Sequence, residues 1–175
     1  MMEKLRLTKP TEALKDAYME YYREWLQSGE DAVPWVVSKN PADFEGMLAW
    51  YAEREKGINL PEGWVPDSTY WLVTEQNRLL GVANLRHSLT PFLMDRGGHI
   101  GYGIRTSERR KGYAGELLRL ALIEAKQLGI SEVLVVCDAI NTASAKTILK
   151  NGGSPDMDFI EEDGNVIKRF WIRNE

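Results

Sequence analysis

The sequence predicts a mixed α/β fold, with helices on both faces of one sheet of six to seven strands, and three observations predict it. Residues 97–114, GGHIGYGIRTSERRKGYA, have the pattern of a strand, a basic glycine-containing loop and the start of a helix. Residues 133–137, VLVVC, are apolar at every position, as in a central strand that helices cover on both faces. An amphipathic helix lies between these two strands, so we expect them to be parallel and joined by a right-handed crossover.

The first half of the chain supplies a strand, two helices and a pair of strands. Thr11 is a suitable N-cap for a helix with apolar and aromatic residues along one broad face, ending near Gly29. Pro41 follows a second suitable cap, Asn40, and opens the next helix. The predicted elements are a strand at 5–7, helices at 11–29 and 41–51, a loop at 57–67, and strands at 70–74 and 79–86.

The second half alternates strands and helices and ends in a hairpin. The helix after the basic loop has its apolar residues on one stripe and Gly129 as its C-cap. The pair Asp163-Gly164 is a strong signal for a hairpin turn. The predicted elements are strands at 99–104 and 133–137, helices at 114–128 and 144–151, and hairpin strands at 157–161 and 166–172.

Length and composition are those of an ordinary globular protein. The 175 residues are 43% hydrophobic and 27% charged, which fits one domain spanning residues 1–175. A single cysteine, Cys137, excludes a disulfide framework and a cysteine-based zinc site, and it fits a reducing compartment. We find no signal peptide, no apolar run of membrane-spanning length and, at a net charge of −4, no sign of a nucleic-acid binder. We therefore expect a cytoplasmic protein with no metal and no nucleic-acid or membrane partner.

The basic loop has the composition of an anion site. It carries Arg109, Arg110 and Lys111 before Gly112, and Gly112 lets the backbone approach a ligand where a Cβ would intrude. A strand that empties through such a loop into a helix directs several backbone N–H groups at one point. The anion bound there is most often a phosphate.

Two other phosphate-binding loops do not match. A Walker loop ends in Gly-Lys-Ser/Thr, whereas here Lys111 precedes Gly112 and no Ser or Thr follows. A dinucleotide fingerprint places three glycines at the opening of a helix, whereas Gly101 and Gly103 lie inside the predicted strand. Both alternatives are therefore excluded.

The pattern that remains is Arg/Gln-x-x-Gly-x-Gly/Ala, which Arg109, Gly112 and Ala114 satisfy. A strand precedes it, and a helix, an apolar strand, the sequence NTASA from Asn141 and a last helix follow it. In this order of elements, residues 98–153 resemble the acyl-CoA-binding core of the GNAT superfamily of N-acetyltransferases. The resemblance covers about a third of the chain. It implies a GNAT-like fold that uses acetyl-CoA, with the pantetheine arm between splayed parallel fourth and fifth strands.

The resemblance also implies which residues bind the cofactor. Backbone N–H groups from Arg110 to Ala114 would hold the pyrophosphate, and a backbone N–H near Ile104 would polarise the thioester carbonyl. Asn141 matches the family's asparagine beside the pantetheine, although a plain helix N-cap is an equally good interpretation. Ser144 is either a further contact or a first-turn residue that satisfies a backbone group. The expected cofactor-binding residues are Ile104, Arg109, Arg110, Lys111, Gly112, Tyr113, Ala114, Asn141 and Ser144.

The residues that usually supply the acid and the base in this family are missing. Its common base position falls on Gly98, and its tyrosine acid falls on Ile148. Strand alternation places Tyr102 on the same face as Gly98, so the Tyr102 hydroxyl is the first candidate for a proton role. His99 has a suitable pKa range but faces the other way, which makes it the second candidate.

The tryptophans indicate where an acceptor would bind. Trp35 and Trp64 flank prolines in predicted loops, and aromatic walls suit a cationic amine. Trp25 and Trp50 are better explained as helix core. Asp138, just past the fifth strand, would receive an amine proton through water or cap a turn.

These observations predict an N-acetyltransferase that transfers an acetyl group from acetyl-CoA to a primary amine of a small molecule or peptide, by direct attack in a ternary complex. The alternative is a catalytically silent acyl-CoA-binding module that acts as a sensor or scaffold. The C-terminal hairpin keeps more apolar residues than one covered face requires. We therefore also expect a homodimer through this hairpin, with Phe170 or Trp171 at the interface.

Overall fold

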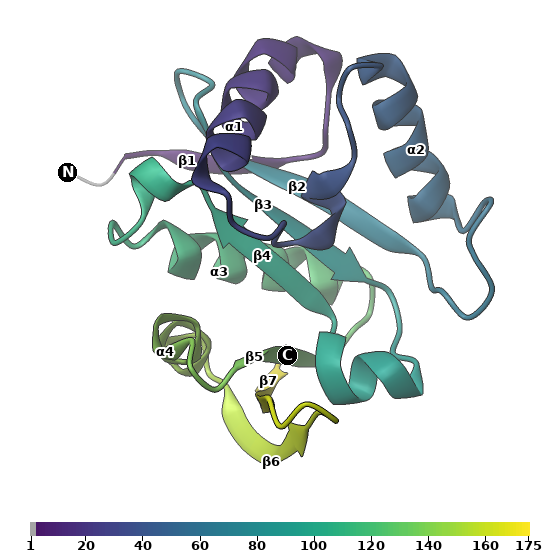
Figure 1. Ribbon diagram of the computed structural model, residues 1–175, viewed down its shortest axis with the longest axis vertical. Helices are drawn as coiled ribbons and strands as arrows, with labels where there is room; N and C mark the ends of the chain where they lie inside the picture. Colours follow the sequence, from purple (N-terminus) through teal and green to yellow (C-terminus); the bar gives the residue numbers. More distant parts are fainter. Residues whose placement is uncertain (1–2) are drawn as a thin grey trace.

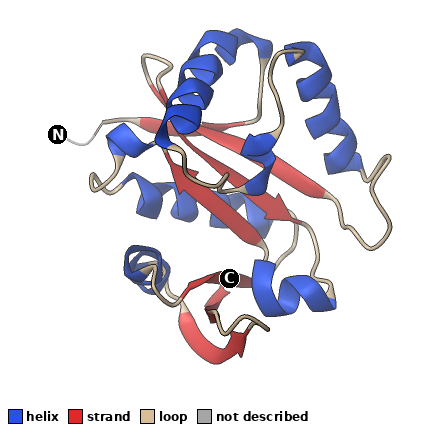
Figure 2. Cartoon of the chain, in the orientation of Figure 1, coloured by secondary structure: helices blue, strands red, loops and turns tan. Residues whose placement is uncertain are grey.

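The computed structural model describes residues 3–175, which form strands in two groups with helices around them (Figures 1 and 2). Four short helical turns, η1 (Glu12–Leu14), η2 (Trp35–Ser38), η3 (Leu93–Gly97) and η4 (Thr106–Glu108), connect the main elements. The main elements are β1 (Leu5–Thr8), α1 (Lys15–Ser28), α2 (Phe44–Lys56), β2 (Asp67–Thr74), β3 (Leu79–Arg86), β4 (Ile100–Ile104), α3 (Tyr113–Gln127), β5 (Glu132–Asp138), α4 (Thr142–Lys150), β6 (Ser154–Ile160) and β7 (Val166–Arg173).

The strands form two antiparallel sheets, in the orders β1-β2-β3-β4 and β5-β7-β6. The mixed α/β class is confirmed, but the single continuous sheet that we predicted is divided between β4 and β5. The two strands meet at one point, where the His99 N–H donates to the Leu134 carbonyl at 2.7 Å. Farther along, Tyr102 of β4 reaches Ser144, which follows β5. The strands therefore run in the same direction and part as they go.

Helices cover both faces of the first sheet because β2 and β3 are apolar on both sides. One face packs against α3 through side chains such as Leu72, Leu80 and Leu117, all fully or almost fully buried. The other face packs against α1 and α2 around Trp71, which stacks on Tyr18 at 4.6 Å between ring centroids. These two cores fix α1 and α3 on opposite sides of β4.

The first two helix starts differ from the prediction, and α4 also begins two residues earlier than predicted, at Thr142. The Thr11 side chain makes no capping bond, and a 3-10 turn precedes α1, which begins at Lys15. The second helix begins at Phe44, because Asp43 supplies the cap by accepting from the Gly46 N–H at 3.0 Å. Asn40 instead accepts from the Ala42 N–H, so this side chain closes a turn before the helix.

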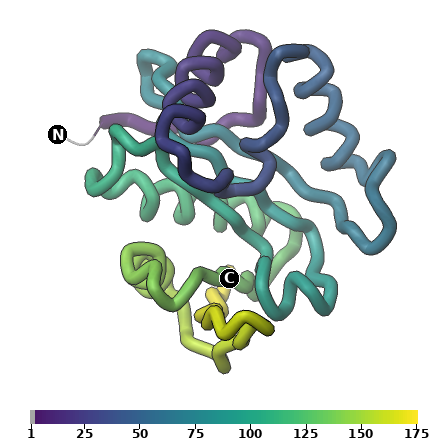
Figure 3. Tube along the Cα trace, viewed as in Figure 1, coloured from purple at the N-terminus to yellow at the C-terminus, as the bar shows by residue number. Residues whose placement is uncertain are grey.

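Two glycines of β4 allow another segment to cross it closely. A Cβ on Gly103 would overlap the carbonyl oxygen of Val33, and one on Gly101 would lie 3.4 Å from the Cβ of Pro34. The chain between α1 and α2 therefore passes directly over β4, as the trace in Figure 3 shows. These glycines belong to the packing of this crossing, which no local pattern in the sequence indicates.

The C-terminal hairpin uses its aromatic residues within its own chain. Phe170 is only 5% exposed and belongs to the core beside α3, so its side chain packs within its own chain. Trp171 donates its indole N–H to Asp156 of β6 at 2.9 Å. The apolar side chains that β6 leaves exposed are Met157 and Ile160.

Candidate functional site

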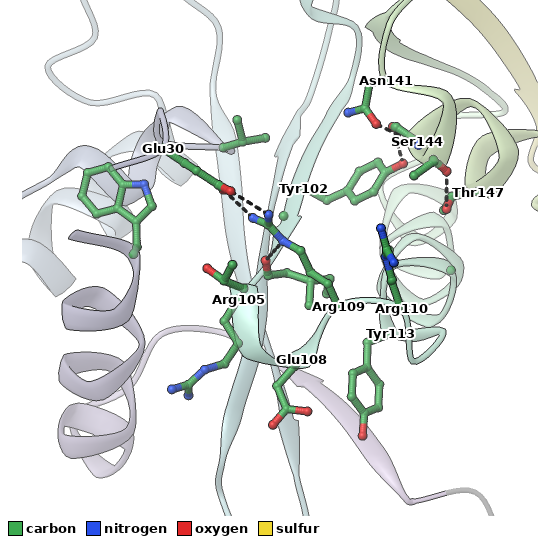
Figure 4. A pocket seen from close by; sticks show the side chains of 18 of the residues that line it. Glu30, Tyr102, Arg105, Glu108, Arg109, Arg110, Tyr113, Asn141, Ser144 and Thr147 are labelled. Atoms are coloured by element: carbon green, nitrogen blue, oxygen red, sulfur yellow. Dashed lines mark hydrogen bonds and ion pairs between the residues drawn. The ribbon is translucent and has the colours of Figure 1, made fainter. Parts of the chain in front are cut away.

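A cavity of about 550 Å³ opens where β4 and β5 part. Four segments line it: the end of α1 with the residues after it, the second half of β4, the loop from β4 to α3, and the first turns of α4 (Figure 4). β4 of the first sheet and α4, which follows β5 of the second sheet, thus contribute opposite walls. Because both strands end toward the same side, the loops after them converge on the cavity, as expected for ligand sites in open α/β sheets.

The N-terminus of α3 faces this cavity without a side-chain cap. Gly112 is the N-cap at a φ of 85°, and no side chain within residues 3–175 caps the first turn. The helix's own bonds begin at the Glu116 N–H, which donates to the Gly112 carbonyl. The N–H groups of Tyr113, Ala114 and Gly115 therefore have no partner within the helix, and all three residues line the cavity. This arrangement suits an anion.

Most cations of the loop are already paired. Arg109 holds Glu30 with both terminal nitrogens, at 2.9 and 2.6 Å, and donates its Nε–H to the Ile104 carbonyl at 3.0 Å. Lys111 pairs with Glu108 at 2.9 Å and does not line the cavity. Arg110 makes no ion pair with any residue in 3–175, and Figure 4 shows it extending from the loop toward α4. Arg110 is therefore the loop cation open to a ligand.

Two glutamates of α1, Glu20 and Glu24, form ion pairs and hydrogen bonds that hold the same loop. Glu24 accepts from Arg105 at 3.1 Å and from the Ser107 hydroxyl at 2.7 Å. Burial would raise the pKa of Glu24, but these hydrogen bonds outweigh it and lower that pKa to about 2. Glu20 joins Arg105 to Arg78. The loop is thus held by the ion pairs of Glu20 and Glu24 with Arg78 and Arg105.

The opposite wall carries neutral hydroxyl and amide groups. The Tyr102 hydroxyl lies 2.9 Å from the Ser144 hydroxyl, across the gap between β4 and α4. Burial raises the pKa of Tyr102 to about 12, so this phenol keeps its proton at neutral pH. Asn141 caps α4 by accepting from the Ser144 N–H at 3.1 Å. The cap interpretation of Asn141 therefore holds, and the residue also lines the cavity.

The second proton candidate, His99, lies elsewhere. Its Nδ1 accepts from the Leu134 N–H at 2.9 Å, which places the ring proton on Nε2 and joins the two sheets. Burial and the nearby Arg86 lower the pKa of His99 to about 4. His99 does not line the cavity, nor does Asp138, which accepts from the Asn165 side chain at 2.9 Å.

The tryptophans are distributed differently from the expectation. Trp35 and Trp64 line a separate hollow of about 240 Å³, together with Trp50 and Arg54. Trp25 packs against the core around Trp71, as expected, and it also lines the main cavity one helical turn after Tyr21. The i, i+4 spacing of Tyr21 and Trp25, continued by Glu30 just beyond the helix, is the sequence signal for this wall.

Comparisons with known proteins assign the family. The sequence model of the acetyltransferase (GNAT) domain matches residues 4–154. The chain therefore belongs to the GNAT acetyltransferase family, and its class is that of the N-acetyltransferases. Among curated proteins, none matches the sequence significantly.

Solved structures establish the same fold over almost the whole chain. The acetyltransferase from Salmonella typhimurium that modifies the N-terminal serine of ribosomal protein L7/L12 has a TM-score of 0.67 at 14% identity, covering 98% of this chain and 95% of that chain. The same type of enzyme in complex with coenzyme A gives 0.67 at 16% identity, covering 97% and 93%. A chimera of spermidine N-acetyltransferase from Vibrio cholerae and hSSAT gives 0.67 at 13%, covering 97% and 95%.

Residues 3–175 contain neither a membrane-spanning helix nor a cluster of metal-ligating side chains. No helix there is long and apolar enough to cross a membrane. No group of His, Cys, Asp or Glu side chains in that range is placed to hold a metal ion.

Proposed function

We propose that this protein transfers the acetyl group of acetyl-CoA to a primary amine, by direct attack in a ternary complex formed in the main cavity. One observation carries the proposal: the uncapped N-terminus of α3 and the Tyr102–Ser144 hydroxyl pair line the same cavity. The first suits phosphates and the second suits the departing thiolate. The cavity's volume also lies within the usual range for small-molecule sites, about 300–1,000 Å³.

The proposed cofactor site uses backbone groups along β4. Two backbone hydrogen bonds pair the ends of β4 with β3. The backbone N–H of Arg105 donates to the Leu80 carbonyl, and the backbone N–H of Arg86 donates to the His99 carbonyl. By alternation, the backbone groups of Tyr102 and Ile104 face away from β3, toward the gap. The Ile104 carbonyl accepts from Arg109, which leaves the Ile104 N–H for a ligand. In our proposal these N–H groups bind the pantetheine arm and the thioester carbonyl.

The phosphates would bind at the loop. The N–H groups from Arg110 to Ala114, together with the Arg110 side chain, form the proposed pyrophosphate site. Arg109 and Lys111, paired with Glu30 and Glu108, act chiefly by shaping the loop. Asn141 keeps its amide N–H groups for the ligand, because its oxygen is the cap of α4.

Tyr102 and Ser144 would supply the proton for the leaving thiolate. A thiol has a pKa near 8.5, so the thiolate gains from a proton donor at neutral pH. With a pKa of about 12, Tyr102 is a donor and a poor base. Glu30 is also a poor base, because its hydrogen bonds to Arg109 lower its pKa. We therefore propose that the amine loses one proton to solvent before it attacks, and that the second proton, which the nitrogen releases as the amide forms and the C–S bond breaks, restores the Tyr102 phenol through solvent.

The acceptor would bind on the α1 side of the cavity. Trp25, Glu30 and Asp31 line that wall, and aromatic rings beside carboxylates favour a cationic amine. Acetyltransferases that share this fold act on spermidine and on a protein N-terminus, both of which present primary amines. A small molecule or a peptide amine fits this wall.

An amine screen tests the proposal. Free thiol release from acetyl-CoA is measured with a panel of polyamines, amino acids and short peptides, and acetylated product is identified by mass spectrometry. The proposal expects at least one amine that releases thiol and gains one acetyl group. Binding of acetyl-CoA with no release for any amine would favour the alternative, an acyl-CoA-binding sensor or scaffold.

We also propose that the protein works in the cytoplasm as a homodimer assembled through the C-terminal hairpin. β6 is an edge strand, and it exposes Met157 and Ile160 at 81% and 65%. Exposed apolar edges are usually paired or covered. Light scattering at micromolar concentration tests this point, since a mass near 20 kDa would reject the dimer. Met157→Lys with Ile160→Lys should restore the monomer if the interface is the one proposed.

A further inference from the structure

The Arg54 guanidinium contacts the rings of three tryptophans that come from three segments of the chain. The Arg54 Cζ lies 4.7 Å from the ring centroid of Trp35 in η2, 5.1 Å from that of Trp50 in α2 and 5.3 Å from that of Trp64 in the following loop. Arg54 itself is only 5% exposed. Its planar, delocalised and weakly hydrated charge stacks on aromatic faces, whereas a lysine ammonium is a compact, strongly hydrated point charge.

The same guanidinium is fixed to the first sheet. Arg54 pairs with Asp67 of β2, and the other oxygen of Asp67 accepts from the Asn84 amide of β3 at 2.9 Å. Asp67 is 2% exposed and Asn84 is fully buried. Arg54 is therefore held by rigid strands on one side while it holds aromatic rings on the other.

Trp35 connects Arg54 to Val33, which lines the main cavity two residues earlier in the chain. Pro34 and Val33 precede it, and they cross Gly101 and Gly103 of β4 in close contact. Val33 lines the main cavity, whereas the Trp35 ring lines the smaller hollow. The segment 33–35 thus links the two spaces, with Val33 at the main cavity and Trp35 at the smaller hollow.

We propose that Arg54 is a positioning residue for catalysis, acting through Trp35 to hold residues 33–35 as the acceptor-side wall of the cavity. The inference rests on the proposed function for its catalytic consequence. The small hollow is then no binding site of its own, since its rings are engaged by Arg54. Displacement of the wall by a small distance would misplace the amine and leave the phosphate loop intact.

Two variants separate positioning from general stability. Arg54→Lys keeps the charge beside Asp67 but loses the planar contact with three rings, and Trp35→Leu breaks the link without leaving a buried charge unpaired. Met47→Ala is the matched control, because Met47 is fully buried on the same helix and belongs to the core around Trp71. It lowers stability without touching the Arg54–Trp35 contact.

Hydrogen exchange measured by mass spectrometry gives a readout that needs no acceptor. The Val37 and Lys39 amides donate to the carbonyls of Pro34 and Val36, so they report whether this segment stays in place. We expect at least tenfold faster exchange in peptides covering 30–39 for Arg54→Lys and Trp35→Leu. The Met47→Ala control should leave exchange in that peptide within twofold of wild type at matched distance below its melting temperature.

Kinetics with the best amine from the screen completes the test. We expect kcat/KM for the amine to fall at least tenfold in both variants, with the dissociation constant of acetyl-CoA within twofold. Unchanged exchange at 30–39, or faster exchange with unchanged kcat/KM, would overturn the inference. Absence of turnover in wild type would instead reject the proposed function, and the exchange data would still decide whether Arg54 holds the wall.

Discussion

The two ends of the gap between β4 and β5 use the same strands in opposite ways. At the closed end, His99 bonds Leu134 twice, once through its backbone and once through its ring, and the sheets are joined. At the open end, Tyr102 and Ser144 face each other across the cavity with only one side-chain bond between them. The difference shows that a residue's place along the gap, more than its intrinsic pKa, decides whether it is available for chemistry.

His99 illustrates this most clearly. It has the intrinsic pKa best suited to proton transfer at neutral pH, yet its Nδ1 is occupied and burial lowers its pKa to about 4. Tyr102 has an intrinsic pKa far from neutrality, yet it lines the cavity with its proton retained. The closed end therefore contributes rigidity, and the open end contributes the groups proposed to act.

The largest expected effect comes from filling the open end at the phosphate loop. Gly112→Val should weaken acetyl-CoA binding at least about a hundredfold, because a β-branched side chain at a φ of 85° would distort the loop and intrude on the anion site. The measurement is the melting-temperature shift with acetyl-CoA. Gly129→Val is the control, since Gly129 also has a positive φ, 81°, at the other end of α3. Equal loss in both variants would contradict a specific role for Gly112.

The next effect concerns the hydroxyl pair. Tyr102→Phe should lower kcat about ten- to a thousandfold, because the phenol is the proposed proton donor, and it should leave acetyl-CoA affinity nearly unchanged. Tyr113→Phe is the matched control, since that tyrosine also lines the cavity but donates its hydroxyl to Glu3. A wild-type rate in Tyr102→Phe would leave catalysis to positioning and backbone polarisation.

A third prediction tests the closed end. The folded protein protonates His99 only near pH 4, whereas an unfolded histidine binds a proton near 6.5. The unfolded state therefore binds more protons in this interval, and the free energy of unfolding falls as the pH drops from 6.5 toward 4. The loss is on the order of 3 kcal/mol when complete. Denaturant titrations across this range should show a shallower decline for His99→Gln, which removes the titrating ring. Identical pH profiles would contradict the buried, neutral state of His99.

The smallest expected effect concerns Glu30, which lines the cavity and pairs with Arg109. Glu30→Gln should tighten acetyl-CoA binding about two- to fivefold at low salt, because the variant removes a carboxylate that lines the cavity and repels the phosphates. Glu20→Gln removes one negative charge in the same way. Because Glu20 lies on α1 and does not line the cavity, this variant should have less effect. Weaker binding in Glu30→Gln would show instead that the pair with Arg109 is needed to hold the loop.

Features set by residues close together in the sequence were predictable, whereas features set by contacts between distant residues were not. The turn and helix start of the proposed phosphate loop were predictable because Gly112 and Ala114 lie within the turn and helix that they themselves form. The separation of Trp35 and Trp64 from the main cavity depends on Arg54 and on close packing over Gly103, which no periodicity encodes. The pairing of Arg109 with Glu30 joins residues 79 positions apart. The role of His99 depends on the register between two sheets, so only the tertiary structure assigns it.

The most direct test of the central claim compares the affinities of acetyl-CoA and adenosine 3′-phosphate 5′-diphosphate by calorimetry. If the gap between β4 and β5 holds the pantetheine arm, acetyl-CoA should bind at least about tenfold more tightly than the nucleotide portion alone, since the arm adds backbone bonds and buried apolar area. Equal affinities would contradict the account, because the open end of the gap would then contribute nothing to binding.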